Sequence, residues 1–260
     1  MNIKEKYGTW ALVTGASDGM GKAVAQQLAM RGLNLVLVAR SQNKLESFKA
    51  ELQNTHPIQI KTLALDLSER SANPILFEAT RDLDIGLFVA AAGFGSAGNF
   101  VDNNCATELN MIDLNCRSVV EQTHEFATRF KNRQRGSLVL FSSIFAFQGV
   151  PRSANYAATK AFIQTFGEGL SLELAPLGVD VLLVAPGPVL SGFAHRAQMN
   201  ISFGATPDQV GVSIVKTLGK RTTLRPGWLA KVLEFALWST FSRRIRTRLL
   251  AVITKDMTRQ

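Results

Sequence analysis

Residues 10–31, WALVTGASDGMGKAVAQQLAMR, decide how this chain folds. They begin as an uncharged apolar run, WALVTG, which is typical of a strand buried on both faces. They end as an amphipathic stretch, Met20 to Arg31, which predicts a helix. Between the two lies a turn with glycines at 15, 19 and 21. A strand that passes through such a turn into a helix is the first unit of a parallel α/β sheet.

Apolar runs and longer amphipathic segments alternate over most of the chain. Further buried strands are predicted at residues 33–39, 58–66, 85–93, 136–143 and 179–187, and helices at 41–53, from about 71, at 105–131 and at 154–174. Strands separated by helices form a parallel sheet that is covered on both faces. We therefore predict an α/β fold of the Rossmann type, a doubly wound parallel sheet in one domain over residues 1–260. Residues 187–206 are expected to form a lid, and residues 227–259 a basic amphipathic helical extension.

Composition and charge argue against several classes of protein. The net charge of +9 is uneven, because residues 221–260 hold nine Lys and Arg but only two acids, which leaves +2 on the first 220 residues. A nearly neutral body does not predict nucleic-acid binding. The N-terminus has no apolar run of signal-peptide length, and no uncharged stretch reaches the ~18 apolar residues of a membrane span. Two cysteines and three scattered histidines predict neither a disulfide framework nor a metal site, and we expect a cytoplasmic protein.

The glycine turn has the spacing of a dinucleotide-binding loop. Gly15 permits a tight turn, Gly19 lets the backbone approach a pyrophosphate, and Gly21 lets the helix pack closely on the strand. The helix N-terminus then presents free N–H groups to the anion. We predict that this loop, including Ser17 and Met20, binds a nucleotide, although a plain tight turn is the alternative. Asp18 is expected to cap the helix and point to solvent.

Arg40 ends the second predicted strand, where a dinucleotide-binding unit usually has an acid for the ribose 2′-hydroxyl. An arginine at this position favours a 2′-phosphate, through charge-assisted hydrogen bonds. The interpretation is therefore NADP(H) as the cofactor, with NAD(H) less favoured. An exposed arginine that simply starts a helix is the alternative.

Tyr156 stands four residues before Lys160, on the same face of a predicted helix. An ammonium near a phenol lowers the phenol pKa, and the phenol then becomes a usable general acid or base. The pair alone could equally be an ordinary surface feature. Ser143 ends the fifth predicted strand and is placed to hold a substrate oxygen beside the phenol, with Ser142 as the competing candidate.

With these motifs the chain resembles the short-chain dehydrogenase/reductase family over about residues 7–195. The resemblance rests on TGASDGMG from residue 14, Asp66-Leu67 after the third strand, LNCRS around Asn115, Ser143, the Tyr156–Lys160 pair, and PGPVLS from Pro186. It implies that Tyr156 is the proton donor and that Ser143 positions the carbonyl. It also implies that Lys160 lowers the tyrosine pKa and binds the nicotinamide ribose, and that Asn115 holds a water linking Lys160 to solvent.

The resemblance implies further cofactor contacts. Asp66, with Leu67, would meet the adenine, and the segment after the sixth strand would hold the nicotinamide carboxamide. The residues implied are Ala92 and Gly93 after the fourth strand, and Pro186, Gly187, Val189 and Ser191 after the sixth. The chain departs from the family at residues 90–93, Ala-Ala-Ala-Gly, where Asn-Asn-Ala-Gly is usual. The strut that asparagine forms between strands is therefore absent or replaced.

Aromatic residues surround the predicted site, namely Phe94, Phe145, Phe147 and Phe193. A small polar centre with apolar walls favours a lipophilic ketone or alcohol as the substrate. A ketosteroid, a 3-ketoacyl thioester, an aryl ketone and a quinone all remain open. We predict an NADP(H)-dependent oxidoreductase that interconverts a ketone and a secondary alcohol, and a homodimer or homotetramer. A non-catalytic NADP(H)-binding sensor or scaffold on the same fold is the alternative.

The basic segment from Trp228 carries apolar residues at helical spacing, with Arg243, Arg244, Arg246 and Arg248 around its middle. A basic amphipathic helix with tryptophans is able to lie on an anionic membrane surface. The alternative, which we favour, is a helix packed on its own domain or on a partner subunit.

Overall fold

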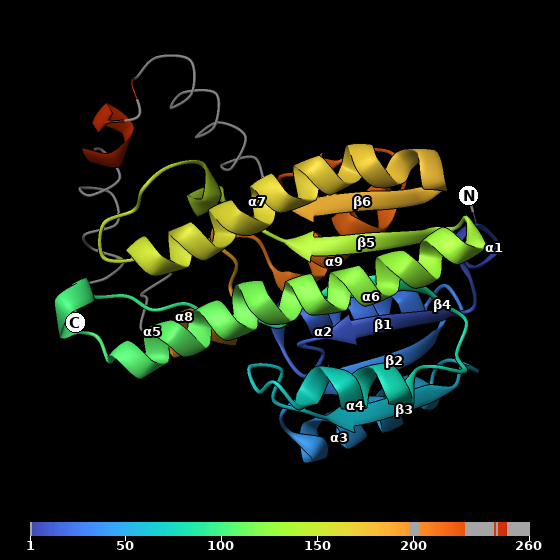
Figure 1. Ribbon diagram of the computed structural model, residues 1–260. Coiled ribbons are helices and arrows are strands. Elements are labelled where there is room, and N and C mark those ends of the chain that lie inside the picture. Colours follow the sequence, from blue (N-terminus) through green and yellow to red (C-terminus); the bar gives the residue numbers. More distant parts are fainter. Residues whose placement is uncertain (1, 198–202, 227–241, 243, 249–260) are drawn as a thin grey trace.

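The computed structural model describes residues 2–197, 203–226, 242 and 244–248 of the chain (Figure 1). Its centre is a seven-stranded sheet in which every pairing is parallel, with the order β3-β2-β1-β4-β5-β6-β7. The strands are β1 (Trp10–Thr14), β2 (Asn34–Ala39), β3 (Ile60–Ala64), β4 (Ile85–Ala90), β5 (Gly136–Phe141), β6 (Val179–Val184) and the short β7 (Thr223–Leu224). The six strands predicted from the sequence are therefore confirmed.

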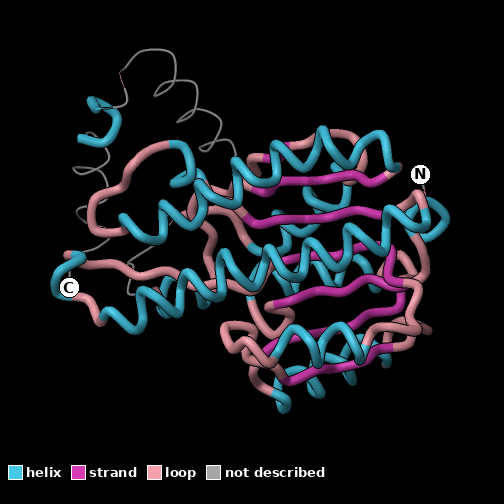
Figure 2. Tube along the Cα trace, viewed as in Figure 1, coloured by secondary structure: helices cyan, strands magenta, loops and turns pink. Residues whose placement is uncertain are grey.

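Helices cover both faces of this sheet, as the tube in Figure 2 shows. They are α1 (Ile3–Tyr7), α2 (Gly19–Ala29), α3 (Gln42–Gln53), α4 (Ala72–Ala79), α5 (Cys105–Ile112), α6 (Ser118–Arg133), α7 (Ala154–Leu174), α8 (Gly192–Arg196) and α9 (Pro207–Thr217). Helices α4, α6 and α7 pack on one face, and α2, α3 and α9 on the other. This is the predicted doubly wound Rossmann-type fold.

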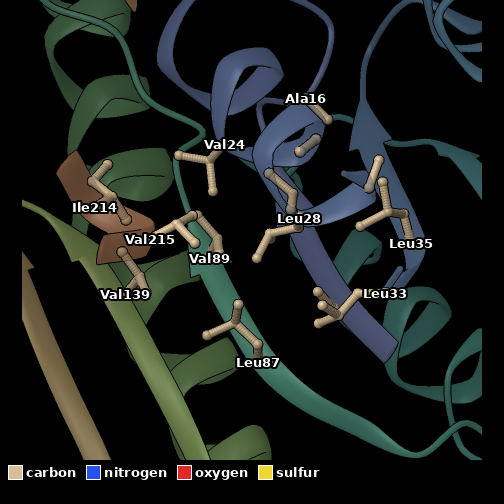
Figure 3. Packing of buried hydrophobic residues seen from close by; sticks show 14 of the residues in the cluster. Ala16, Val24, Leu28, Leu33, Leu35, Leu87, Val89, Val139, Ile214 and Val215 are labelled. Carbon is tan, nitrogen blue, oxygen red and sulfur yellow. The ribbon is translucent and has the colours of Figure 1, made fainter. Parts of the chain in front are cut away.

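Two hydrophobic clusters bind these layers to the sheet. On one face, Leu28 of α2 and Ile214 of α9 are fully buried against strand residues such as Val89 and Val139 (Figure 3). On the other face, Phe126 of α6 stacks on Phe88 of β4, with ring centroids 4.8 Å apart. Because the central strands are buried on both sides, their sequences are continuous apolar runs without alternation.

The order of the strands places the ligand-binding edge. The chain winds from β1 outward to β3 and then crosses back to β4, so that β1 and β4 are neighbours. A crevice forms where the winding direction changes, at the carboxyl ends of these two strands. The arrowheads in Figure 1 point to this edge.

The helix predicted over residues 105–131 is interrupted. A π-helical segment, η2 (Asp113–Arg117), separates α5 from α6. π-Helical turns are frequent at functional sites because they redirect side chains. Here the turn contains Asn115, which reaches the loop after β4.

The described part of the segment expected to form a lid, residues 187–197 and 203–206, contains one short helix, α8. The two ends of the whole segment meet in an isolated parallel bridge between Val189 and Ala205. Most of the C-terminal extension lies outside the described residues. Its described part, residues 244–248, is helical and lies beside Gly149. None of the described helices combines the length and the hydropathy needed to cross a membrane.

Candidate active site

A cleft of about 280 Å³ opens at the carboxyl ends of β1, β2 and β4. It brings together most of the residues predicted to bind the cofactor. These are Gly15, Ser17, Gly19, Met20, Gly21, Arg40, Asp66, Leu67, Ala92, Gly93 and Ser191, with Phe94 and Phe193 at the same cleft. Ser143, Tyr156, Lys160 and Asn115 do not line this cleft, but Phe193 does, and its ring contacts that of Tyr156.

The glycine loop has the conformation that its spacing predicts. Gly15 and Gly19 have φ values of 65° and 55°, in the left-handed region that L side chains rarely adopt. A Cβ at Gly21 would lie 2.3 Å from the carbonyl oxygen of Gly15, so only glycine lets α2 pack this closely on β1. Because α2 begins at Gly19, the amides of Met20 and Gly21 have no carbonyl four residues earlier within the helix. The loop therefore fits an anionic group at its open side.

Asp18 caps α2, as predicted, but it also forms an ion pair. Its carboxylate accepts a hydrogen bond from the Gly19 amide at 2.7 Å and pairs with the Arg196 guanidinium at 2.7 Å. Burial raises the Asp18 pKa, but the bonds from Arg196 and Gly19 outweigh it, and the net pKa is lowered. The negative charge beside the glycine loop is therefore offset by a cation from α8.

The end of the cleft at Arg40 and Lys44 carries basic side chains. The Arg40 side chain is 74% exposed, and its Nη1 lies 4.0 Å from Oδ2 of Asp66. Asp66 also accepts bonds from the Ser68 amide and hydroxyl, at 3.0 and 2.7 Å. Lys44 and Arg196 line the same cleft and were missed by sequence reasoning. Lys44 stands one helical turn after Arg40, whereas nothing local in the sequence marks Arg196.

Thr14 holds the loop after β4, where the chain lacks the asparagine expected from the resemblance. The Thr14 hydroxyl accepts a hydrogen bond from the Ala92 amide at 3.0 Å and donates to the Val89 carbonyl at 3.4 Å. The loop after β4 is thereby fixed to β1. A Cβ at Gly93 would lie 2.9 Å from Oδ1 of Asn115, so glycine is required there as well.

Asn115 is buried and ties three segments together. Its Oδ1 accepts from the Phe94 amide at 3.2 Å, and its Nδ2 donates to the Phe94 carbonyl at 2.9 Å and to the Thr159 hydroxyl at 3.1 Å. Thr159 directly precedes Lys160 on α7. The π-helical turn therefore joins the loop after β4 to the helix that carries the Tyr156–Lys160 pair.

The choice between the two adjacent serines is decided by the direction of their side chains. Ser142 is buried and donates to the Lys160 carbonyl at 3.1 Å. Ser143 is the residue whose hydroxyl lies near enough to the Tyr156 phenol to lower its pKa, and this hydroxyl also accepts from the Phe145 amide at 3.2 Å. Because successive residues of a strand point to opposite faces, only one of the two reaches the phenol.

Tyr156 and Lys160 lie together, but their arrangement differs from the expectation. The Lys160 Nζ lies 5.7 Å from the centre of the tyrosine ring and donates to the Phe141 carbonyl at 2.9 Å. Burial raises the pKa of Tyr156, and the bond from Ser143 only partly counters it. Burial also lowers the pKa of Lys160 to about 8. The predicted lowering of the tyrosine pKa is not found, because the ammonium contacts a backbone carbonyl and the ring instead of the hydroxyl.

Two of the four predicted aromatic residues contact the Tyr156 ring, and a third lines the cleft. Phe145 contacts Tyr156 edge-on with ring centroids 6.3 Å apart, Phe193 lies at 5.5 Å, and Phe94 follows β4 at the cleft. Phe147 instead lies under the Arg225 guanidinium, 4.7 Å from the ring centroid. The walls around the phenol are thus built by Phe145 and Phe193.

The segment after β6 closes the other side of the cleft. The buried Pro186 accepts a backbone hydrogen bond from Ile144 at 3.1 Å, and Gly187 follows it. Val189 is buried and pairs with Ala205. Ser191 lies across the cleft from the glycine loop, since a Cβ at Gly19 would come 3.3 Å from its Cβ. This segment therefore spans the distance between the glycine loop and the phenol.

The sequence of the chain is similar to those of known proteins. Residues 9–201 match the model of the short chain dehydrogenase family. A 7beta-hydroxysteroid dehydrogenase of Clostridium sardiniense is 36% identical over 233 residues, covering 88% of this chain and 89% of the relative. A very-long-chain 3-oxoacyl-CoA reductase of Neurospora crassa is 37% identical over 184 residues, covering 69% of this chain and 55% of the relative.

Solved structures of proteins with a similar fold support the same family. One from a study of 7beta-hydroxysteroid dehydrogenase stereoselectivity superposes with a TM-score of 0.89 at 28% identity, covering 96% of this chain and 99% of the other. A short-chain dehydrogenase from Sphingobium yanoikuyae in complex with NADPH has a TM-score of 0.79 at 28% identity, covering 90% and 96%. With its motifs, its sheet order and these relatives in agreement, the chain belongs to the short-chain dehydrogenase family of oxidoreductases.

Proposed function

We propose that this protein is an NADP(H)-dependent oxidoreductase that reduces a lipophilic ketone to a secondary alcohol. The observation that carries the proposal is the placement of Ser143 and Tyr156 beside Lys160, next to the cleft of the glycine loop. Together, a hydroxyl, a phenol and an ammonium are able to donate a proton to a carbonyl oxygen and to stabilise the negative charge that develops on it.

The residues of the cleft fit a dinucleotide. The amides at the start of α2 would bind its pyrophosphate, and Asp66 would meet its adenine. Arg40 and Lys44 form a basic end that suits a 2′-phosphate, which supports NADP(H) over NAD(H). Val189 and Ser191 would hold the carboxamide end. The bound cofactor would supply the hydride.

Tyr156 would donate a proton to the carbonyl oxygen. Its raised pKa keeps the phenol protonated at neutral pH, which is the state that a general acid needs. Ser143 would donate its own hydrogen bond to the same oxygen and hold the carbonyl against the phenol. Once the substrate oxygen has taken the proton, the Ser143 hydroxyl would donate to the phenolate instead, in keeping with its lowering effect on the Tyr156 pKa.

Lys160 would return a proton to the phenolate. With its pKa lowered to about 8, it holds and releases a proton near neutral pH more easily than an exposed lysine does. Its ammonium would also bind the ribose of the cofactor. We propose that Asn115 holds a water on this route, while its side-chain hydrogen bonds fix the loop after β4 and Thr159.

The substrate would be lipophilic because the walls beside the phenol are apolar. Phe145 and Phe193 pack with Ala97, Ala194 and Ala197 into a small cluster at this place. The relatives act, by their names, on hydroxysteroids and on very-long-chain 3-oxoacyl-CoA, and both substrates have large apolar parts. A ketosteroid or a long-chain oxo compound is therefore the first choice for assay.

The test is NADPH oxidation with a panel of steroid, aryl and long-chain ketones. Tyr156→Phe should lower turnover at least ~100-fold, the lower end of the usual range for general acid catalysis, while NADPH binding is retained. Tyr7→Phe is the matched control, since Tyr7 is the other tyrosine and donates to Asp180 at 2.7 Å, away from the cleft. A Tyr156→Phe variant with more than a tenth of the wild-type rate would refute the role. NADPH binding without reduction of any ketone would favour the sensor or scaffold instead.

We further propose one domain over residues 1–260, a lid at 187–206 and a cytoplasmic homo-oligomer. Exposed apolar side chains on α5 and α7, among them Leu109, Phe162 and Leu172, support the oligomer. For the extension at 227–259 we propose packing on the protein itself or on a partner subunit. Salt-sensitive sedimentation with phosphatidylglycerol vesicles, lost on truncation after Pro226 in a protein that still binds NADPH, would instead establish peripheral membrane contact.

A further inference from the structure

A second cavity, of about 610 Å³, adjoins the proposed active site. It lies between the loop after β4, the first turn of α5, and Arg152 before α7. Phe94 and Arg196 line both this cavity and the cofactor cleft. Gly95 also lines it, and a Cβ there would lie 3.1 Å from Cδ2 of Tyr156. Tyr156 itself does not line the cavity, so Gly95 is the point at which the cavity wall comes close to the tyrosine ring, and no residue of the glycine loop lines this space.

The wall of this cavity changes in character with distance from the phenol. Ala97 and Ala197 are buried next to Phe145 and Phe193, so the part near the phenol is apolar. Farther out, the lining consists of asparagines, two acids and the guanidinium groups of Arg152 and Arg196. A ligand that fills both parts must have an apolar body and a polar end.

The two arginines differ in their partners. Arg196 forms the ion pair with Asp18 at 2.7 Å. Arg152 is half-buried. Among the residues that the structure describes, its guanidinium has no partner in an ion pair or a hydrogen bond. A half-buried cation without a partner is costly and binds an anion strongly when one is offered.

The acids of the cavity are already bonded to amides. Glu108 is buried and accepts from Nδ2 of Asn103 at 2.8 Å and of Asn155 at 2.7 Å. Asp102 is exposed and accepts from Nδ2 of Asn99 at 3.0 Å. Neither carboxylate pairs with Arg152, although all three line the same cavity.

The backbone keeps Arg152 in place. Its φ is 63°, in the left-handed region where glycine is the usual residue, and its carbonyl accepts from the Gly98 amide at 3.0 Å. Residues with strained backbone conformations occur often at functional sites, and glycine would form this turn with less strain. Here the side chain supplies the unpaired guanidinium of the cavity.

We propose that Arg152 binds a carboxylate at the far end of the substrate, and that the substrate is a lipophilic keto acid whose carbonyl lies at Tyr156. This inference rests on the proposed function. The guanidinium matches a carboxylate in two parallel hydrogen bonds, while the apolar body of the substrate covers Ala97 and Phe193. Arg152 is then a binding residue that selects the acid over its neutral ester.

The experiment compares three keto acids, a ketosteroid acid, an aryl keto acid and a long-chain oxo acid, each with its methyl ester. In every class that is reduced, wild-type enzyme should prefer the acid roughly tenfold in kcat/KM, a difference typical of one charge-assisted hydrogen bond. Arg152→Gly should abolish this preference mainly through KM, while Arg152→Lys should retain part of it. The glycine variant is expected to fold, because glycine adopts the φ of this position freely.

Arg31→Gln is the matched control for the loss of one positive charge. Arg31 follows α2 at the edge opposite the cleft and bonds only to Gln27 among the described residues, so its variant should keep the preference. Equal kcat/KM for acid and ester in the wild type, or an unchanged preference in Arg152→Gly, would overturn the proposal. If no ketone of any class is reduced, the proposed function falls, and this inference falls with it.

Discussion

Replacement of Asn115 by alanine tests how the π-helical turn supports the site. Alanine removes the two bonds to the Phe94 backbone and the bond to Thr159. The Thr159 hydroxyl keeps a partner, because it also donates to the Tyr156 carbonyl at 2.8 Å. Two backbone groups are therefore left without their partner in Asn115→Ala.

The magnitude follows from these two groups. Each buried polar group left unpaired costs about 1–3 kcal/mol, and Phe94 is only half-buried, so we expect about 2–3 kcal/mol in total. For a chain of this size each kcal/mol lowers Tm by roughly 2–4 °C, so the midpoint should fall by about 4–12 °C. Turnover should fall as well, because the same bonds position Gly93 and the residue before Lys160.

Thermal melting followed by circular dichroism measures the first effect, and ketone reduction the second. Asn132→Ala is the control, since Asn132 is exposed on α6 and should melt with the wild type. Asn115→Leu keeps the branching of asparagine at Cγ without its polar atoms, and it should lose at least as much stability as the alanine variant. If Asn115→Ala melts within 1–2 °C of wild type (roughly 0.5 kcal/mol), or if leucine restores the midpoint, hydrogen bonding is not what holds this turn.

Two further predictions concern the cofactor and the cysteines. We expect NADPH to bind at least ~10-fold more tightly than NADH. Arg40→Ala should lose most of this preference, because the 2′-phosphate would lose its charged partner. Equal affinities of the wild-type protein for NADPH and NADH in a fluorescence titration would refute this. Burial raises the pKa of the Cys116 thiol to about 11, so this thiol is protonated at pH 8, whereas Cys105 is exposed. Ellman's reagent should therefore label Cys105 quickly and the partly buried Cys116 much more slowly, and Cys105→Ser should abolish the fast phase. Two thiols reacting at the same rate in native protein would contradict the burial of Cys116.

The order of apolar runs and glycines was sufficient to predict the fold. Buried parallel strands have continuous apolar sequences, and the turn at residues 14–21 needs glycine for steric reasons that act within a few residues. These are local constraints, so they can be read from the chain without knowing what lies beside it. The family was predictable for the same reason, because its motifs follow the strands in a regular order.

Contacts between distant segments were decided only by the tertiary structure. Which of Ser142 and Ser143 faces the phenol depends on how β5 meets α7, and the pairing of Arg196 with Asp18 joins residues 178 positions apart. The pKa of Tyr156 was predicted in the wrong direction because spacing on a helix indicates that Lys160 is near but not which atoms its ammonium contacts. Burial and the direction of a side chain arise from packing, and packing is a property of the folded chain as a whole.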